Sequence, residues 1–434
     1  MQVQLAYGSQ GLNVEVPDSA HVVAPVPVPG LGDEQRAIVD ALETPIGCAP
    51  LAELVRPTDS VVIVHSDITR PMPNNRVLPV LLSRLEAAGV RRSQITLLNA
   101  LGTHRRQTES ELIAMLGSEV VQRYRCLQHD AWDDENLLPI GTTGFGNTVR
   151  INRTYMQADA KILTGFIEPH FFAGFSGGPK AVLPSIAGAD SVLSNHGERM
   201  IGNPSATWGV TSGPGAGDPA AAGNPIWEEM LEVALATNPT FLLNVTLNRS
   251  RELTGVFAGD LVQAHAAGTR FCRESAMVHV PQLYDIVVTT NSGYPLDQNL
   301  YQCVKGMSAA ARVVRPGGTI IVAAECRDGL PEHGEYANLL RSASSPESLL
   351  ERLQTPGFRS QDQWQVQVQA IVQMRASVQV HSDGLTESQI RDALLTPCPN
   401  VELRIAELME QYGPGASICV LPEGPQTVPV PPAS

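Results

Sequence analysis

Residues 60–117 read SVVIVHSDITRPMPNNRVLPVLLSRLEAAGVRRSQITLLNALGTHRRQTESELIAMLG. This stretch contains two short apolar runs, residues 60–65 and 94–99, and each is followed by a polar loop and then by a helical spacing of apolar residues. A continuous apolar run bounded by loop signals is typical of a buried strand. The second helical segment opens at residue 108 with TESE, a capping-box pattern. Strand and helix therefore alternate, which predicts a parallel sheet with helices on its faces.

The same alternation continues along the chain and restarts once. A further strand is expected at residues 161–167, and residues 202–224 form a long loop rich in Gly, Pro and Ala. Composition shifts near residue 278, and strand, helix and strand follow again over residues 285–324. We therefore predict two α/β domains with a mainly parallel sheet in each.

The domain boundaries follow from this pattern. Residues 1–277 form the first domain and residues 278–400 a second, Rossmann-like domain. The helix and strand expected in residues 401–421 could instead complete the first domain. Residues 422–434 are rich in proline, which predicts a flexible tail.

Composition excludes several classes of protein. The hydrophobic fraction is 43%, which is typical of a globular chain, and the net charge is −14 with no run of basic residues. Nucleic acid and anionic membrane surfaces are therefore not expected partners. There is no long apolar span or signal-peptide pattern, and the seven cysteines include no CxxC pair. We expect a cytoplasmic protein with reduced thiols and no cysteine metal site.

Two polar loops follow the strands of the opening stretch. The first contains Asp67 and Arg70, and an arginine can hold a carboxylate through two parallel hydrogen bonds. The second contains His104, and histidine ordinarily titrates near neutrality, as an acid–base group requires. Each loop could equally be a solvated surface turn.

A glycine-rich loop follows the strand expected at residues 161–167. Its residues Ser176, Gly177 and Gly178 expose backbone N–H groups that could cradle a phosphate, although the spacing is not that of a P-loop. Lys180 follows directly. A surface lysine at the start of a helix is disfavoured by the helix dipole, whereas an unprotonated amine there could attack a carbonyl group.

Two further groups of residues could bind or react. His170 and His196 are scattered histidines that would be structural unless they converge with His104, and no HExxH zinc signature is present. Tyr301, Gln302 and Lys305 open the helix expected at residues 299–313 and fall near one helical edge, where they could bind hydroxyl and carboxylate groups or simply form a polar first turn.

Together these segments resemble the nickel-pincer lactate racemase family, over residues 60 to 370 approximately. The matching motifs are HSDITRP, NALGTHR, GFIEPHFFAGFSGGPKAVLPSIAG, SNHGERM, YPLDQNLYQCVKG and DQWQVQ, in the same order and at similar spacing. The third motif is long and unusual, which makes it the most specific of the six.

The resemblance implies a cofactor, a nickel-pincer nucleotide (a pyridinium-3,5-bisthiocarboxylic acid mononucleotide that holds nickel). It implies that Lys180 tethers this group through a thioamide and that His196 supplies the protein ligand to nickel. It also implies that partner cofactor-biosynthesis enzymes make this group and that the site lies in the cleft between the two domains.

The resemblance further implies how a substrate would be handled. His104 and His170 would be the acid–base pair, with Asp67 orienting His104. Arg70, Gln302 and Lys305 would bind the carboxylate and hydroxyl of a 2-hydroxy acid, and Tyr301 and Trp364 would line the cofactor or substrate.

The function expected on this basis is racemisation at C2 of a small, lactate-like 2-hydroxy acid by hydride transfer. An alternative within the family is a larger substrate such as a sugar acid, malate or an aryl-lactate. Two alternatives outside it are a Schiff-base enzyme that uses Lys180 and a nickel-binding protein without catalysis.

Overall fold

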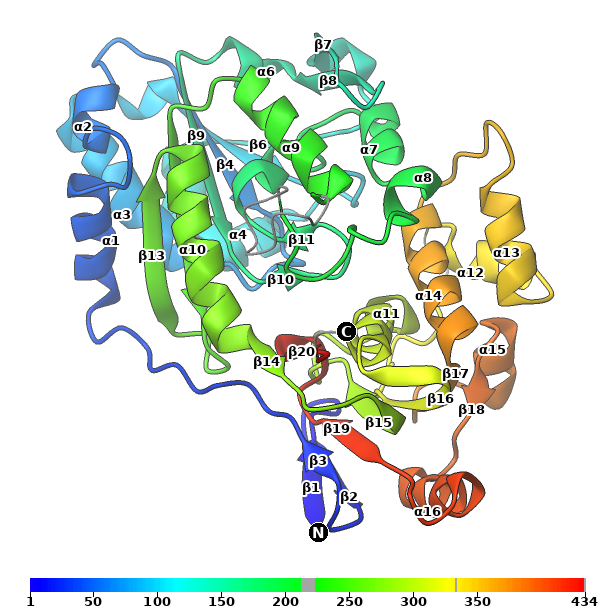
Figure 1. Cartoon of the computed structure of the whole chain (residues 1–434). Helices are drawn as coiled ribbons and strands as arrows, with labels where there is room; N and C mark the ends of the chain where they lie inside the picture. Colours follow the sequence, from blue (N-terminus) through cyan, green and yellow to red (C-terminus); the bar gives the residue numbers. More distant parts are fainter. Residues whose placement is uncertain (212–222, 332–333, 433–434) are drawn as a thin grey trace. The chain divides into compact units, whose positions relative to one another are not determined.

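The computed structural model describes residues 1–211, 223–331 and 334–432, and the chain forms two compact units (Figure 1). The N-terminal unit consists of Pro27–Asn195 and Ser205–Arg273. The C-terminal unit consists of Met1–Val26, His196–Pro204 and Glu274–Ser434. Each unit contains a six-stranded sheet that is mainly or entirely parallel, so the predicted α/β fold class is confirmed.

The sheet of the N-terminal unit has the order β13 (Leu253–Gly259), β12 (Phe241–Leu247), β9 (Ala160–Phe166), β4 (Val61–Ser66), β5 (Ile95–Ala100) and β6 (Arg125–Gln128). Only β13 is antiparallel to its neighbour among these strands. Because β9, β4 and β5 are adjacent and parallel, the loops that follow them emerge at the same edge of the sheet.

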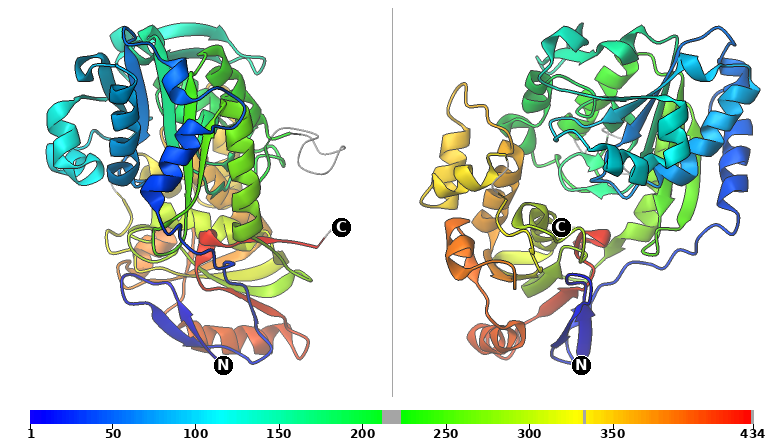
Figure 2. Two further views of the ribbon diagram at one scale, coloured as in Figure 1. Left: turned by 90° about the vertical axis from the view of Figure 1, so that its left-hand side faces the viewer. Right: turned by 180° about the vertical axis from the view of Figure 1, so that it is seen from behind.

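Helices cover both faces of this sheet. The blue helices α1 (Glu34–Glu43) and α3 (Asn74–Ala87) lie on one face, and the green helices α9 (Pro225–Ala236) and α10 (Leu261–Ala276) lie on the other (Figures 1 and 2). The core on the first face contains fully buried leucines of α3, each of which stabilises the fold by about 2 kcal/mol.

Shorter elements complete the N-terminal unit. They are α2 (Leu51–Leu54), α4 (Glu109–Leu116), α5 (Ser118–Arg123), α6 (Arg153–Gln157), α7 (Ala189–Asn195), the hairpin β7 (Leu137–Thr142) with β8 (Thr148–Asn152), the pair β10 (Pro169–His170) and β11 (Gly174–Phe175), and the 3₁₀ turns η1 (Arg92–Gln94), η2 (Asp134–Asn136) and η3 (Gly178–Ala181). The predicted capping box opens α4. Of the loop predicted at residues 202–224, residues 212–222 lie outside the described residues.

The sheet of the C-terminal unit has the order β18 (Thr396–Pro397), β17 (Ser377–His381), β16 (Val314–Ala323), β15 (Tyr284–Thr290), β19 (Ile418–Leu421) and β3 (His21–Val22), and all neighbours are parallel. The remaining elements are α8 (Glu198–Ile201), α11 (Leu300–Ala311), α12 (Tyr336–Arg341), α13 (Pro346–Leu353), α14 (Gln363–Arg375), α15 (Glu387–Asp392), α16 (Val401–Tyr412), η4 (Gly424–Gln426), the hairpin β1 (Gln2–Leu5) with β2 (Leu12–Glu15), and the pair β14 (Met277–His279) and β20 (Val428–Val430).

The two compact units divide the chain differently from the predicted domains. Residues 401–421 do not complete the N-terminal unit, because β19 pairs with β15 and α16 packs in the core of the C-terminal unit. Residues 1–26 also belong to the C-terminal unit, where β3 pairs with β19. In the predicted tail 422–434, of which residues 422–432 are described, β20 pairs with β14 and Val428 is buried.

Two short helices flank His196. Residues 187–200 contain α7 and α8, which are separate because Gly197 is extended (φ −80°, ψ 165°) and caps α8. His196 therefore lies between two short helices. Within the described part of the chain, no helix combines the length and the apolar character that a membrane span needs.

Candidate active site

Two loops that follow neighbouring parallel strands meet at Asp67 and His104. The register pairs Ser66 at the end of β4 with Ala100 at the end of β5. Nδ1 of His104 lies 2.8 Å from Oδ2 of Asp67. The Thr69 hydroxyl donates to the other carboxylate oxygen at 2.7 Å. The carboxylate is therefore bonded at both oxygens and fixes the orientation of the imidazole.

The surroundings of Asp67 keep its carboxyl ionised. Asp67 is 4% exposed, and burial by itself would raise the pKa of the carboxyl. His104, Arg70 and the hydrogen bond from Thr69 together oppose burial and lower this pKa below its usual value. Because a carboxylate only accepts, Nδ1 of His104 donates, and Nε2 of the neutral ring is left with a lone pair.

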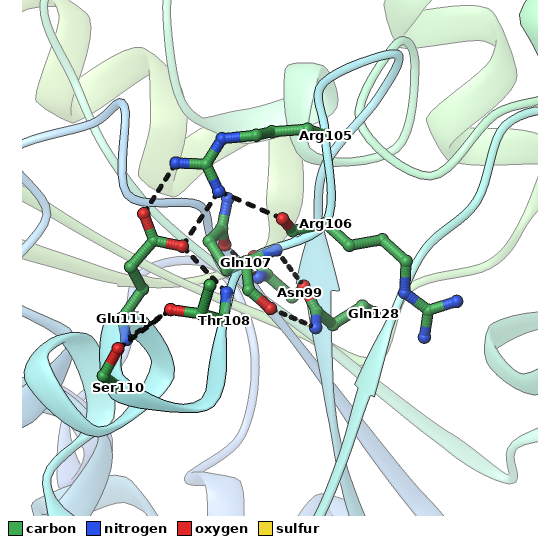
Figure 3. Close-up of polar contacts among 8 residues, drawn as sticks. All are labelled: Asn99, Arg105, Arg106, Gln107, Thr108, Ser110, Glu111 and Gln128. Atoms are coloured by element: carbon green, nitrogen blue, oxygen red, sulfur yellow. Dashed lines mark hydrogen bonds and ion pairs between the residues drawn. The ribbon is translucent and has the colours of Figure 1, made fainter.

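Side chains within the loop between β5 and α4 hold that loop in place, as Figure 3 shows. The Arg105 guanidinium donates to both carboxylate oxygens of Glu111, at 2.6 and 2.9 Å. The backbone N–H of Gln107 donates to Oε1 of Gln128 at 2.7 Å, and Nε2 of Gln128 donates to the carbonyl of Gln107 at 2.9 Å. Asn99 also donates to the Gln107 side chain. These bonds anchor the loop to β5 and β6.

His170 lies in the tight β10–β11 pair that follows β9. The backbone N–H of Ala173 donates to Nδ1 of His170 at 3.2 Å. The histidine is buried, and its ring stacks on Phe171 with centroids 4.8 Å apart. Because a backbone N–H only donates, Nδ1 holds a lone pair and Nε2 carries the hydrogen of the neutral ring. His104 and His170 are thus held in opposite tautomers.

The glycine-rich loop that precedes Lys180 is bonded back to the end of β9. The Ser176 hydroxyl donates to the carbonyl of Phe166 at 2.7 Å and accepts the N–H of Glu168 at 2.9 Å. Gly177 and Gly178 have φ values of +72° and +52°, a conformation that glycine adopts without strain. These two glycines allow the sharp change of direction into η3.

Lys180 lies in η3 and is 7% exposed. Its Nζ is 5.6 Å from the centroid of the Phe172 ring. The chain is poor in this residue type: its lysines are Lys161, Lys180 and Lys305, whereas Lys and Arg together number 30. Arginine supplies charge but no nucleophilic amine, because the guanidinium stays protonated. Two of these three lysines, Lys180 and Lys305, are predicted site residues.

In the C-terminal unit, His196 packs on α14. Its ring meets Trp364 edge to face, with centroids 5.7 Å apart and an angle of 85°. Nε2 of Gln363 donates to the carbonyl of His196 at 3.4 Å, and Nε2 of Gln367, one turn later, donates to the carbonyl of Glu198 at 2.8 Å. Helix α14 therefore holds the short segment around His196 by two glutamines.

The same helix holds the first turn of α11. Nε1 of Trp364 donates to the Tyr301 hydroxyl at 3.1 Å, and the Gln365 amide donates to the carbonyl of Tyr301. Gln302 and Lys305 follow on α11 and are half-buried. The predicted residues Tyr301 and Trp364 are thus in direct contact, with His196 beside them.

Comparison with known proteins identifies the family. Residues 7–209 match the model of the lactate racemase N-terminal domain, and residues 280–428 match that of the lactate racemase C-terminal domain. The chain belongs to the lactate racemase family. The two matched regions contain all the predicted site residues of both units.

Individual members of the lactate racemase family are similar over most of their length. The lactate racemase of Thermoanaerobacterium thermosaccharolyticum is 36% identical over 395 residues, which cover 90% of this chain and 89% of that protein. The lactate racemase of Lactiplantibacillus plantarum is 36% identical over 392 residues, which cover 90% of each. Family membership places the chain among the isomerases.

Solved structures agree with this family. The lactate racemase apoprotein from Thermoanaerobacterium thermosaccharolyticum superposes with a TM-score of 0.90 at 32% identity, over 99% of this chain and 100% of that chain. A protein from Thermotoga maritima superposes with a TM-score of 0.69 at 19% identity, over 92% of this chain and 98% of that chain, and this likeness shows the fold alone.

Sequence analysis of this lactate racemase family member missed the glutamines of α14. Gln363, Gln365 and Gln367 are buried and hold the His196 segment and α11. A signal was present, because residues 363–369, QWQVQVQ, alternate polar and apolar residues. Glutamines that recur at every second position of a buried helix must find partners on several sides of it.

Proposed function

We propose that the chain racemises a small, lactate-like 2-hydroxy acid with the help of a nickel-pincer nucleotide tethered to Lys180. The observation that carries this proposal is the carboxylate-oriented imidazole of His104 in a member of the lactate racemase family. The names of the similar proteins support lactate or another short 2-hydroxy acid as substrate.

The side chains present fit the proposed cofactor. Among the described residues, no group of three or more His, Cys, Asp or Glu side chains could hold a metal ion by itself. The His196 imidazole would hold the nickel, and the nucleotide itself would supply the other donors. The tether needs an amine, which Lys180 has and an arginine would lack. When bound, this group would accept and return a hydride at C2 of the substrate.

Proton transfer falls to the two histidines. Nε2 of His104 has the lone pair that can accept the substrate hydroxyl proton, and Asp67 stabilises the imidazolium that results. In His170 the neutral ring presents an N–H at Nε2, which can donate to the substrate oxygen. His104 can therefore accept the substrate proton and return it to the same oxygen once C2 has been inverted, while the neutral His170 ring donates a hydrogen bond to that oxygen.

Substrate binding falls to cationic and amide side chains. The planar Arg70 guanidinium can hold a carboxylate through two bonds, and Lys305 and Gln302 on α11 can bind a carboxylate or a hydroxyl. Tyr301 would line the site with Trp364, to which it is hydrogen-bonded. Arg70 belongs to the N-terminal unit, and Tyr301, Gln302, Lys305 and Trp364 belong to the C-terminal unit.

The proposed function is tested on protein that is produced together with cofactor-biosynthesis enzymes. Intact mass should show an adduct that peptide mapping places on Lys180, and a panel of chiral 2-hydroxy acids should lose optical activity. Racemisation of lactate alone supports the proposal, whereas turnover only of malate, a sugar acid or an aryl-lactate moves the substrate to the larger class. An adduct-free and inactive protein, beside an active family member, would overturn the proposal.

A further inference from the structure

The loop that leads to Lys180 is enclosed by two side chains from distant parts of the sequence. A Cβ atom added at Gly177 would lie 2.6 Å from Oδ1 of Asn244, and one added at Gly178 would lie 2.5 Å from Cδ2 of His265. Neither Asn244 nor His265 belongs to a motif that the sequence analysis singled out. Both glycines are therefore needed for close approach to these two side chains as well as for their positive φ.

Asn244 binds the loop from the sheet. It lies on β12, opposite Gly165 of β9, and it is completely buried. Its Oδ1 accepts the backbone N–H of Gly178 at 2.8 Å. An added Cβ at Gly165 would lie 3.3 Å from Nδ2 of the same asparagine. The asparagine therefore fills the space between the strand and the loop, and a larger residue at either glycine would displace it.

His265 binds the loop from helix α10. Its Nε2 lies 2.9 Å from the carbonyl oxygen of Ser176, and since a carbonyl only accepts, Nε2 is the donor. The ring stacks on Trp227 of α9, with centroids 4.9 Å apart and an angle of 23°. Burial lowers the pKa of His265 to about 4, although the bond to Ser176 opposes this shift, so the ring is neutral near pH 7. The ring is thus fixed in position and in tautomer.

Ser176 is therefore bonded to α10 and Gly178 to the sheet, a few residues before the lysine. The backbone N–H of Lys180 in turn donates to the carbonyl of Gly177 at 3.1 Å. A displacement of residues 176–178 would be transmitted directly to the backbone of the lysine. A long side chain that must form a covalent bond to a bound group depends on where its backbone starts.

We infer that Asn244 and His265 are positioning residues that hold Ser176–Gly178 so that the Lys180 amine is presented for covalent attachment of the cofactor. This inference rests on the proposed function for the identity of the attached group. The hydrogen bonds to the loop carry the effect, rather than the volume of the two side chains.

Variants separate hydrogen bonding from packing. His265→Gln keeps an N–H donor near the position of Nε2, whereas His265→Phe keeps the ring on Trp227 and loses the donor. Asn244→Leu keeps the volume and loses the acceptor. His129→Phe is a matched control, because His129 is also buried and bonds a backbone carbonyl, that of Ala187, at 3.0 Å.

The first readout is the adduct-bearing fraction of protein co-produced with the cofactor-making enzymes. We expect His265→Phe and Asn244→Leu to lower this fraction by about tenfold or more, because small misplacements near a reacting group have large effects. His265→Gln and His129→Phe should load like the unmodified chain. Full loading of His265→Phe and Asn244→Leu, or equal losses in His265→Gln and His265→Phe, would overturn the inference.

The second readout does not need the cofactor. Reductive methylation with formaldehyde and a borohydride reagent labels amines, and Lys161 on β9 is an internal reference for Lys180. We expect His265→Phe to change the labelling rate of Lys180 by about tenfold or more relative to Lys161. An unchanged ratio of the two labelling rates overturns the inference, whether or not the unmodified chain carries an adduct. An unmodified chain that never carries an adduct would refute only the proposed function. Should His265→Phe not fold, Asn244→Ser is compared by the same ratio.

Discussion

Nδ1 of His104 donates to Oδ2 of Asp67 over 2.8 Å, and the two partners differ in accessibility: 45% of the histidine side chain is exposed but only 4% of the aspartate. The ring is thus anchored at its buried end and remains open to a ligand elsewhere. Burial alone would raise the pKa of the Asp67 carboxyl, but its partners lower it, so this anchor stays charged. A histidine held in this way has one defined tautomer before any substrate arrives.

Replacement of Asp67 by Asn should remove this control. The Asn amide can donate to Nδ1, which favours the tautomer with hydrogen on Nε2 and no lone pair there. We expect racemisation to fall by about 10²–10⁴-fold, while intact mass shows normal cofactor loading. Asp159→Asn is the control, since Asp159 accepts a 2.7 Å bond from Ser60 at the surface. Near-normal turnover by Asp67→Asn would show that the carboxylate does not orient a base.

The opposite tautomers of the two histidines predict unequal effects of glutamine. His104→Gln cannot accept a proton, so racemisation should fall by about 10²–10⁴-fold. His170→Gln still presents an N–H near the position of Nε2, and its loss should be smaller by about tenfold or more. Initial rates from each enantiomer, measured by polarimetry, make the comparison. Equal losses in both variants would mean that His170 also serves as a base, with the lone pair on Nε2.

Lys180→Arg tests the tether with little change in charge. The guanidinium lacks a nucleophilic amine, so no adduct should form. The intact mass of the variant should equal that of its polypeptide alone, even when the cofactor-making enzymes are present. Lys161→Arg is the matched control and should carry the adduct, because Lys161 lies on β9 near the surface residue Asp159. An adduct on Lys180→Arg would place the attachment on another residue.

Stability should decrease as the pH falls below the ordinary range of histidine. Burial lowers the pKa of His65 and of His265 from 6.5 to about 4. Between these values the unfolded chain binds more protons than the folded chain. The stability that each neutral histidine contributes is therefore complete above pH 6.5. It is lost as the pH falls towards 4, and the free energy of unfolding decreases by about 1.4 kcal/mol per pH unit for each histidine.

Urea unfolding across about pH 7 to 5 measures this slope. His265→Gln should reduce it by the contribution of one proton, and His65→Gln by another. A slope that is unchanged in both variants would show that neither ring stays neutral in the folded chain.

Much of this architecture could be predicted from local sequence. The apolar runs before Asp67 and His104 gave buried strands at the right places, and the parallel order explains why these two residues meet. The motifs were specific enough to identify the family. By contrast, the tautomer of His170 depends on a bond from Ala173, three residues later, that has no sequence signature.

Long-range features could not be predicted in this way. Strand β3 pairs with β19, but nothing in the local sequence of either strand predicts this pairing. The sequence therefore could not show that residues 1–26 and 401–421 belong to the same unit. Asn244 and His265 also lacked a signal, because both elements contain other polar residues and neither residue belongs to a motif. Only the glutamines of α14 form a recognisable pattern. Their repetition in one helix could have indicated that they bond to neighbouring segments.

The pairing of β3 with β19 has a consequence for how the protein is made. On the ribosome, the first strand of this sheet emerges long before the strand that joins it to β15, and it must wait unpaired until residues 418–421 are translated. A gene cut near residue 273 would encode a second half that lacks β3 altogether. Its β19 would then present an open edge, along which copies of that fragment could join and aggregate.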